Sequence, residues 1–238
     1  MSRFFVKDFS QDKEKIFITG QDYNHIKNVL RKNVNDKIIC FDTKGIEYET
    51  EIYSFEKDKI ILKIIKSCQK DVESPIKITL AQSLPKGTKF EEIIQKSVEL
   101  GAYEIIPFIS ERSIKKTDKN ERWNKIAKEA CEQCGRTFVP KVKPTTTFEE
   151  IISQSKDYDI KAIPWEAETK YSLKNLLKEN KNISSILILI GPEGGFSQEE
   201  INEATKYGFI PITLGKRILR TQTAGPAVLS MLLYEMEL

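Results

Sequence analysis

The stretch Leu187-Ile188-Leu189-Ile190-Gly191-Pro192-Glu193-Gly194-Gly195-Phe196 decides the fold class. Its apolar half is too short to span a membrane and is typical of a strand buried on both faces of a parallel sheet. After the glycines, Ser197 and Glu200 have the spacing of a capping box, which predicts the start of a helix. The buried stripe of that helix would contain Ile201, Ala204 and Tyr207. A strand, a glycine loop and a helix in this order indicate an open α/β sheet, whose strand ends form a ligand crevice.

The glycine loop differs from the common phosphate-binding motifs. It lacks the Gly-Lys-Ser/Thr ending of a Walker A motif and the G-x-G-x-x-G spacing of dinucleotide-binding proteins. The Glu193 carboxylate would repel a phosphate but would tolerate a ribose hydroxyl or a cationic group. A simpler alternative is that Gly194 and Gly195 only form the turn between strand and helix. The loop therefore favours a nucleotide-like ligand other than a polyphosphate, and it leaves the structural alternative open.

A second junction of the same kind follows, where the apolar run from Phe209 leads into Leu214-Gly215-Lys216-Arg217-Ile218-Leu219-Arg220-Thr221. Cations flank an Ile218-Leu219 pair that we expect to be buried, and they suggest a polyanion nearby. From Thr221 to Leu238, apolar residues occupy nearly every face of the expected helix. A helix with apolar residues on nearly every face must be covered on more than one side, and we expect a second copy of the chain to cover it. A charge at Val228 or Leu232 should therefore disrupt that assembly.

Several segments in a fixed order together resemble the ribosomal RNA small-subunit methyltransferase E family, a branch of the SPOUT methyltransferases. They are KGTKFEEIIQKSVELGA (86–102), ERS (111–113), EACEQCGR (129–136), GPEGGFSQEE (191–200) and LGKRILRTQTA (214–224). The resemblance spans nearly the whole chain. It implies an obligate homodimer and an α/β fold, with a SPOUT-type C-terminal domain that holds a deep trefoil knot, preceded by a small PUA-like β-barrel.

The resemblance also implies a reaction, the S-adenosylmethionine-dependent methylation of N3 of a uridine in 16S rRNA within the assembled 30S subunit. One alternative is a SPOUT methyltransferase for transfer RNA or another rRNA position. The other is a noncatalytic RNA-binding factor for ribosome assembly. That alternative is favoured only by Gln222, where the family has a glutamate, because an amide keeps the hydrogen-bonding reach of the acid but not its charge.

Methylation at N3 requires loss of the imide proton, so the enzyme must stabilise a uracil anion. A guanidinium is the natural partner, and we expect Arg220 to supply it, with Arg136 as a second catalytic candidate and phosphate anchoring as its alternative. Glu193 is a weaker candidate for the base, beside water. The residues expected to bind the cofactor are Leu189, Gly191, Pro192, Glu193, Gly194, Gly195, Leu214, Gly215, Ile218, Leu219, Thr221, Thr223 and Ala224.

The composition describes an ordinary protein of 238 residues, with 39% apolar and 31% charged residues and a net charge of +3. The first residues lack the apolar core of a signal peptide, and no apolar run reaches the length of a membrane span, so we expect a cytoplasmic protein. Cys131 and Cys134 have metal-binding spacing, but they share an apolar helical stripe with Trp123 and Ala127. This pattern predicts buried thiols and no metal site.

The first part of the chain alternates short strands with turns, which predicts a small β-barrel over residues 1–70. Strands are expected at 3–6, 16–19, 37–41, 47–53 and 59–65, with a helix at 22–30. A polar linker ending at Pro75 leads to the second domain, residues 71–238, which would bind the cofactor and form the dimer. Its strands are expected at 77–82, 105–109, 160–164, 185–190 and 209–214, and two of its helices at 90–100 and 122–134.

Basic residues on both domains are candidates for contact with RNA. They are Arg3, His25, Arg31, Arg112, Lys115, Lys116 and Arg122. A solvated basic surface is the alternative for the lysines and arginines between 112 and 128. A packing role is the alternative for His25, the only histidine in the chain.

Overall fold

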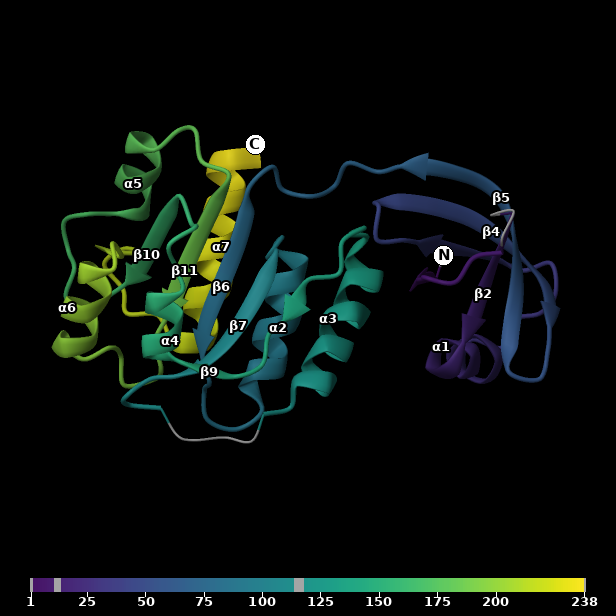
Figure 1. Ribbon diagram of the computed structural model, residues 1–238, viewed down its shortest axis with the longest axis horizontal. Helices are drawn as coiled ribbons and strands as arrows, with labels where there is room; N and C mark the ends of the chain where they lie inside the picture. Colours follow the sequence, from purple (N-terminus) through teal and green to yellow (C-terminus); the bar gives the residue numbers. More distant parts are fainter. Residues whose placement is uncertain (1, 11–13, 114–117, 238) are drawn as a thin grey trace. The chain divides into compact units, whose positions relative to one another are not determined.

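The computed structural model describes residues 2–10, 14–113 and 118–237. These residues form two compact units (Figure 1). One comprises Met1–Glu73 together with Cys131–Val139, and the other comprises Ser74–Ala130 and Pro140–Leu238. The first unit therefore contains a segment that lies far along the chain, which starts with the last turn of a helix whose earlier turns belong to the second unit.

The first unit is a curved five-stranded sheet in the order β1-β3-β4-β5-β2. Its strands are β1 (Arg3–Phe5), β2 (Lys15–Thr19), β3 (Lys37–Phe41), β4 (Ile46–Phe55) and β5 (Lys59–Gln69), and the helical segments are α1 (Gly20–Asn24) and a π-helical turn, η1 (His25–Val29). Alternate strand residues such as Ile16, Ile38 and Ile60 point into one apolar core. The predicted strands are confirmed with small shifts of their ends. Because no ladder joins β1 to β2 among the described residues, the sheet is a half-barrel.

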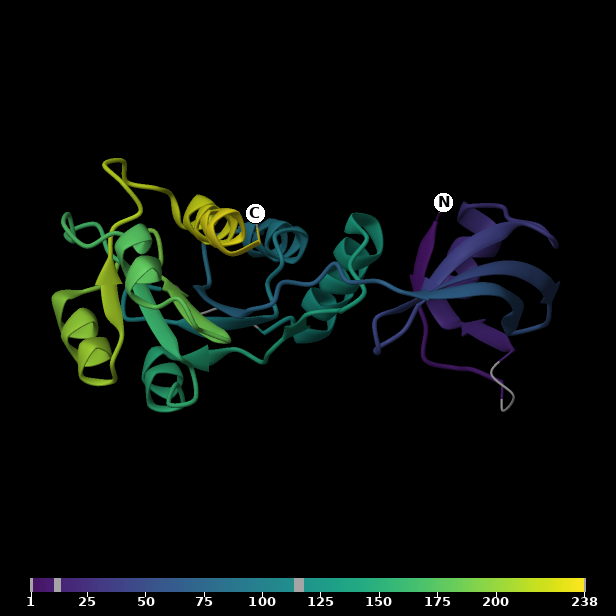
Figure 2. The same ribbon diagram turned by 90° about the horizontal axis from the view of Figure 1, so that it is seen from above.

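The second unit is an α/β sheet in the order β12-β10-β11-β6-β7-β8, with β9 beside β7, and every strand pair in it is parallel. Its strands are β6 (Lys77–Ser83), β7 (Glu104–Ile109), β8 (Lys141–Val142), β9 (Thr146–Thr147), β10 (Ile160–Pro164), β11 (Ser185–Ile190) and β12 (Ile210–Ile212). Its helices are α2 (Lys89–Glu99), α3 (Asn120–Cys134), α4 (Phe148–Ser153), α5 (Leu173–Glu179), α6 (Gln198–Lys206) and α7 (Thr221–Glu237). The predicted α/β class is confirmed, and α2 and α7 lie on the opposite face of the sheet from α4 and α6 (Figure 2).

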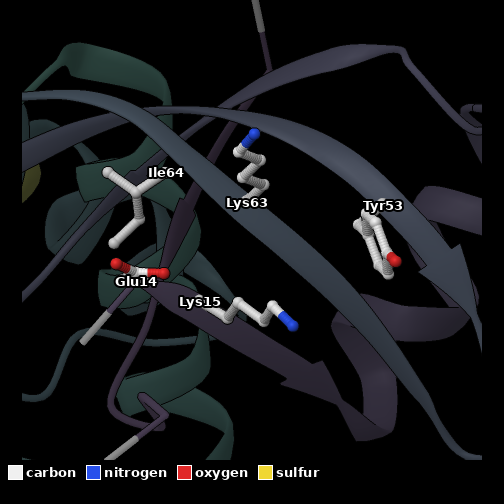
Figure 3. Close-up of a pocket in the computed structure, with 5 residues that line it drawn as sticks. All are labelled: Glu14, Lys15, Tyr53, Lys63 and Ile64. Carbon is white, nitrogen blue, oxygen red and sulfur yellow. The ribbon is translucent and has the colours of Figure 1, made fainter. Parts of the chain in front are cut away.

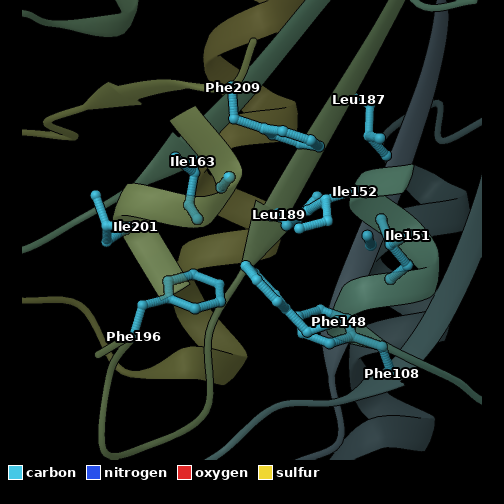
Figure 4. Packing of buried hydrophobic residues seen from close by; sticks show 12 residues of the cluster. Phe108, Phe148, Ile151, Ile152, Ile163, Leu187, Leu189, Phe196, Ile201 and Phe209 are labelled. Carbon is cyan, nitrogen blue, oxygen red and sulfur yellow. The ribbon is translucent and has the colours of Figure 1, made fainter. Parts of the chain in front are cut away.

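The core under α4 and α6 anchors the glycine loop that follows β11 (Figure 4). Phe196, at the end of this loop, is buried with its ring 6.5 Å from that of Phe108 and 5.9 Å from that of Phe148. The predicted capping box of α6 is present, since Ser197 and Glu200 each accept a hydrogen bond from the other's backbone amide. The carboxyl end of the loop is thereby fixed to the core.

Two expectations about buried side chains are wrong, and the proposed test at Val228 and Leu232 needs another interpretation. Tyr207 is 39% exposed, because α6 ends before it, and Phe209 fills the core instead. Ile218 is 85% exposed, although Leu219 beside it is half-buried. Val228 and Leu232 are already buried within the chain, where α7 packs on α2, β6 and β11. A charge at either position would therefore damage the chain's own core, so neither residue tests an assembly.

Candidate functional site

The two glycine loops meet at the carboxyl edge of the second sheet. Strand β11 lies between β6 and β10, so the three strands end side by side. The buried Thr221 hydroxyl donates a hydrogen bond of 2.5 Å to the carbonyl oxygen of Gly191. The amide of Gln82, at the end of β6, donates in turn to Thr221 Oγ1 at 2.9 Å. This chain of hydrogen bonds joins the first loop, the start of α7 and the central strand.

The GPEGGF loop folds into a tight turn in which the Gly195 amide donates to the carbonyl oxygen of Pro192 at 3.0 Å. Gly195 has a φ of +68°, which favours glycine, and a β-carbon there would clash with the Glu166 carboxylate. A β-carbon on Gly191 would lie 3.0 Å from the ring of Phe196. Gly195 thus serves the turn and Gly191 a close approach to the Phe196 ring, while Glu193 and Gly194 are exposed.

The Glu193 carboxylate is poorly suited to act as a base. Its Oε1 accepts a hydrogen bond of 2.9 Å from the Lys86 amide. Partial burial favours a higher pKa, but this hydrogen bond and the neighbouring Lys89 and Lys86 ammonium groups hold the pKa of Glu193 below its ordinary value. Glu193 is therefore a stabilised anion at the edge of the loop and a weak proton acceptor.

The LGKRIL loop leads from β12 into α7. Gly215 has a φ of +120°, and no atom lies within 4 Å of the position that a β-carbon would occupy there. The carbonyl oxygen of Arg220 accepts hydrogen bonds from the amides of Thr223 and Ala224 at 2.8 and 2.9 Å, which begin the helix. The Arg220 side chain is exposed and has no hydrogen-bond or ion-pair partner within the described ranges of the chain.

Arg136, the second catalytic candidate, belongs to the other unit and is held in a structural ion pair. Its Nε and Nη2 atoms donate to Glu73 Oε2 at 2.9 and 2.6 Å, and its side chain is buried. Arg3 is held similarly, with Nη2 2.8 Å from Glu47 Oε2 and Nη1 3.2 Å from the Arg136 carbonyl oxygen. Both guanidinium groups are thus engaged by carboxylates within the first unit.

The remaining RNA-binding candidates are distributed over both units. His25 and Arg31 are exposed on the first unit, and the His25 ring packs edge-on against Phe4 at 5.9 Å. On the second unit, Arg112 donates to the carbonyl oxygen of Gly194 at 2.9 Å, and Arg122 pairs with Glu91 at 2.8 Å. Arg112 is thus an anchor of the first glycine loop. Lys115 and Lys116 lie outside the described residues.

Several polar residues at the strand ends were not predicted from the sequence. Gln82 joins β6 to Thr221, and Glu166 lies against Gly195. The hydroxyls of Ser83, Ser110 and Ser113 form a cluster, with Ser113 Oγ 2.7 Å from each of the other two. The sequence signal that could have found these residues is a polar side chain directly after a buried strand, since the carboxyl ends of parallel strands meet at one edge of the sheet.

Cys131 and Cys134, the pair with metal-binding spacing, are placed where a thiol behaves as a small apolar group. Cys131 is buried, and burial raises the pKa of its thiol to about 12, while Cys134 is half-buried. Among the residues that the structure describes, no group of three or more His, Cys, Asp or Glu side chains could hold a metal ion. Within the same residues, every helix is too short or too polar to cross a membrane.

Comparisons with known proteins agree over both units. A model described as an RNA methyltransferase domain matches residues 72–233, and one described as an RNA methyltransferase PUA domain matches residues 18–65. Ribosomal RNA small subunit methyltransferase E of Bacillus subtilis is 39% identical, covering 100% of this chain and 98% of that protein. The protein of the same name from Mesomycoplasma hyopneumoniae is 37% identical, covering 94% of this chain and 96% of its own length.

A solved structure is similar over the same span. The crystal structure of a ribosomal RNA small subunit methyltransferase E from Neisseria gonorrhoeae, bound to S-adenosyl methionine, is 34% identical with a TM-score of 0.89. The match covers 99% of this chain and 98% of that one. Together with the family models, these full-length matches confirm the resemblance predicted from the sequence, and the chain belongs to the ribosomal RNA small subunit methyltransferase E family.

Proposed function

We propose that this protein transfers the methyl group of S-adenosylmethionine to N3 of a uridine in 16S rRNA, on the assembled 30S subunit. Family membership supports rRNA methylation, and the relative crystallised with S-adenosyl methionine supports the cofactor. The observation that carries the proposal is the hydrogen-bonded junction of Gln82, Thr221 and Gly191, which joins the first glycine loop to the start of α7. Beside it, the Arg220 side chain has no hydrogen-bond or ion-pair partner among the described residues. We further propose that the protein acts in the cytoplasm.

The residues at the strand ends suit a cationic nucleoside better than a phosphate. Carboxylates of Glu193 and Glu166 stand at the GPEGGF loop, where they would repel a phosphate. The open space beside Gly215 allows a ligand to approach the second loop closely. When bound, S-adenosylmethionine supplies an electrophilic methyl group on a sulfonium. The residues proposed to hold it are Leu189, Gly191, Pro192, Glu193, Gly194, Gly195, Leu214, Gly215, Ile218, Leu219, Thr221, Thr223 and Ala224.

The proposed mechanism depends on positioning and on charge stabilisation. The loops would hold the donor in line with N3 of the uridine, since orientation alone supplies much of the acceleration in such transfers. Arg220 would stabilise the uracil anion that forms when the imide proton leaves, because its exposed guanidinium can donate to a ring carbonyl. We do not extend this role to Arg136, because Glu73 already neutralises and binds its guanidinium. With Glu193 a weak base, we propose that water accepts the proton.

The half-barrel is proposed to bind RNA through a face that the sequence did not single out. A pocket on it is lined by Glu14, Lys15, Tyr53, Lys63 and Ile64 (Figure 3). Tyr53 is 60% exposed, and the Lys15 ammonium lies 5.3 Å from the centre of its ring. An exposed aromatic ring beside lysines can stack on an unpaired base while the ammonium groups attract phosphate. His25 and Arg31, also exposed on this unit, remain predicted contacts.

Tyr53→Ala is expected to weaken binding of the protein to 30S subunits roughly tenfold, since stacking on an aromatic ring is worth about 1–3 kcal/mol per base. Tyr53→Phe keeps the ring and should bind like the unchanged protein. Fluorescence anisotropy with labelled protein would measure both affinities. Equal affinities for Tyr53→Ala and the unchanged protein would place RNA binding elsewhere.

We propose that the protein is a homodimer that pairs through α7, and that its C-terminal unit contains a trefoil knot. The support for the dimer is the outer face of α7, where Met231 and Tyr234 are exposed although Val228 and Leu232 on the other face are buried. An exposed aromatic residue on an otherwise apolar helix is typical of a surface that a second copy covers. The support for the knot is the family to which the chain belongs.

Tyr234→Glu is expected to convert the dimer into monomers, because a carboxylate would be buried without a partner at the contact. Tyr207→Glu places the same charge on another exposed tyrosine and should leave the dimer intact. Sedimentation velocity would distinguish the two species. An intact dimer of the Tyr234→Glu protein would exclude this face of α7.

One experiment tests the proposed reaction directly. Purified protein would be incubated with 30S subunits, transfer RNA or naked 16S rRNA and with methyl-labelled S-adenosylmethionine, followed by nucleoside analysis. Labelled 3-methyluridine from 30S subunits alone is the expected result. A label in transfer RNA or in another nucleoside would favour a different RNA methyltransferase. Binding of subunits without any transfer would favour an assembly factor.

A further inference from the structure

Glu166 occupies the centre of the strand-end site, although it belongs to neither glycine loop. Strand β10 lies between β11 and β12, and it ends at Pro164. The Trp165 amide donates to the Ile212 carbonyl oxygen at 3.0 Å, which keeps the chain beside β12 as it leaves the sheet. Glu166 therefore follows the middle strand of the three, with the GPEGGF loop after one neighbour and the LGKRIL loop after the other.

The Glu166 carboxylate faces the backbone of the first loop. A β-carbon built on Gly195 would lie 3.1 Å from its Cδ, 3.2 Å from Oε2 and closer still to Oε1. The carboxylate is exposed, and it has no hydrogen-bond or ion-pair partner among residues 2–10, 14–113 and 118–237. Glu168 differs, because its Oε1 accepts hydrogen bonds from the Lys170 and Tyr171 amides at 2.7 and 3.0 Å. Glu168 stabilises its own turn, whereas Glu166 leaves its oxygens available to a ligand.

We propose that Glu166 binds the ribose diol of the cofactor, an inference that rests on the proposed function. An ionised carboxylate only accepts hydrogen bonds, and its two oxygens match two neighbouring hydroxyl donors. The ribose is the middle of the adenosyl donor, joined to adenine on one side and to the sulfonium chain on the other. A residue between two ligand-holding loops meets the middle of that ligand. Acidic residues at strand ends bind ribose hydroxyls in other α/β nucleotide sites for the same reason.

The test compares ligands that share the ribose and differ elsewhere. The full-length protein, Glu166→Gln and Glu168→Gln would each be titrated calorimetrically with S-adenosylmethionine and with methylthioadenosine, which lacks the amino-acid end and the sulfonium. Glu166→Gln should lower the affinities for both ligands about equally, by roughly tenfold or more, because a hydrogen bond to a charged group is lost. Glu168→Gln keeps an acceptor oxygen for its turn and should change neither affinity more than about twofold.

A second ligand isolates the hydroxyl itself. The 2′-deoxy analogue of methylthioadenosine should bind the unchanged protein more weakly than its parent and should lose less further affinity in Glu166→Gln. Unchanged binding of methylthioadenosine by Glu166→Gln would overturn the ribose assignment, even if the affinity for S-adenosylmethionine fell. Failure of the unchanged protein to bind S-adenosylmethionine would instead overturn the proposed function, so the two failures are distinguishable.

Discussion

Replacing Arg220 with alanine is expected to lower the rate of methyl transfer about 100-fold or more, because one preorganised donor to a developing anion is typically worth that much. The affinity for S-adenosylmethionine should stay within about threefold, since the exposed guanidinium has no hydrogen-bond or ion-pair partner among the described residues and the backbone carbonyl of residue 220 still begins α7. Calorimetry would measure cofactor binding, and a labelled transfer assay on 30S subunits would measure turnover.

Arg217→Ala is the matched control for this experiment. It removes the same charge from an exposed position on the same loop, so a general loss of attraction for RNA would affect both variants. Turnover by Arg217→Ala should stay within about threefold at saturating 30S subunits. If Arg220→Ala turns over at the unchanged rate, or if both variants fall equally, Arg220 does not stabilise the reacting base.

The largest effect on stability is expected from Phe196→Ala, which should lower the free energy of unfolding by about 3–5 kcal/mol. The buried ring packs with Phe108 and Phe148 and also lies against Gly191, so its removal leaves a cavity under the glycine loop. Urea denaturation of the full-length protein would measure the change. Cofactor affinity should fall too, because the loop loses its anchor to the core.

Tyr207→Ala provides a comparison for the stability measurement. Tyr207 lies just after α6, the helix that follows Phe196, and its ring is of similar size but exposed. Tyr207→Ala should therefore change the free energy of unfolding by only about 0.5 kcal/mol. If Phe196→Ala lost no more stability than Tyr207→Ala, the cluster under α4 and α6 would not be a rigid support for the loop.

Local patterns in the sequence predicted much of the second unit. The apolar run that ends at Ile190 became β11 with the expected bounds, because a strand buried on both faces needs uninterrupted apolar residues. The capping box of Ser197 and Glu200 formed as expected, since its partners lie within one helical turn. The resemblance to the methyltransferase family came from short segments of the same kind.

Features that depend on distant residues could not be predicted from these patterns. The link from Gln82 to Thr221 joins residues far apart in sequence, and Glu166 becomes central only through the strand order. Arg3 and Arg136 have the same charge as an RNA-binding arginine, and only the fold supplies the carboxylates that engage them. Ile218 was expected to be buried because it is apolar, but burial depends on whether another surface covers the loop.

The segment Cys131–Val139 limits how this protein could be rearranged by recombination or by protein engineering. Within the first unit, Glu132 Oε1 accepts a hydrogen bond from the Phe5 amide at 2.9 Å, and Arg136 neutralises Glu73. A fragment that stopped at residue 73 would lose both partners and would leave an acid and an amide unsatisfied. Residues 1–73 alone therefore do not form a self-contained domain. A fusion that transfers the half-barrel to another enzyme would have to include the segment Cys131–Val139 as well.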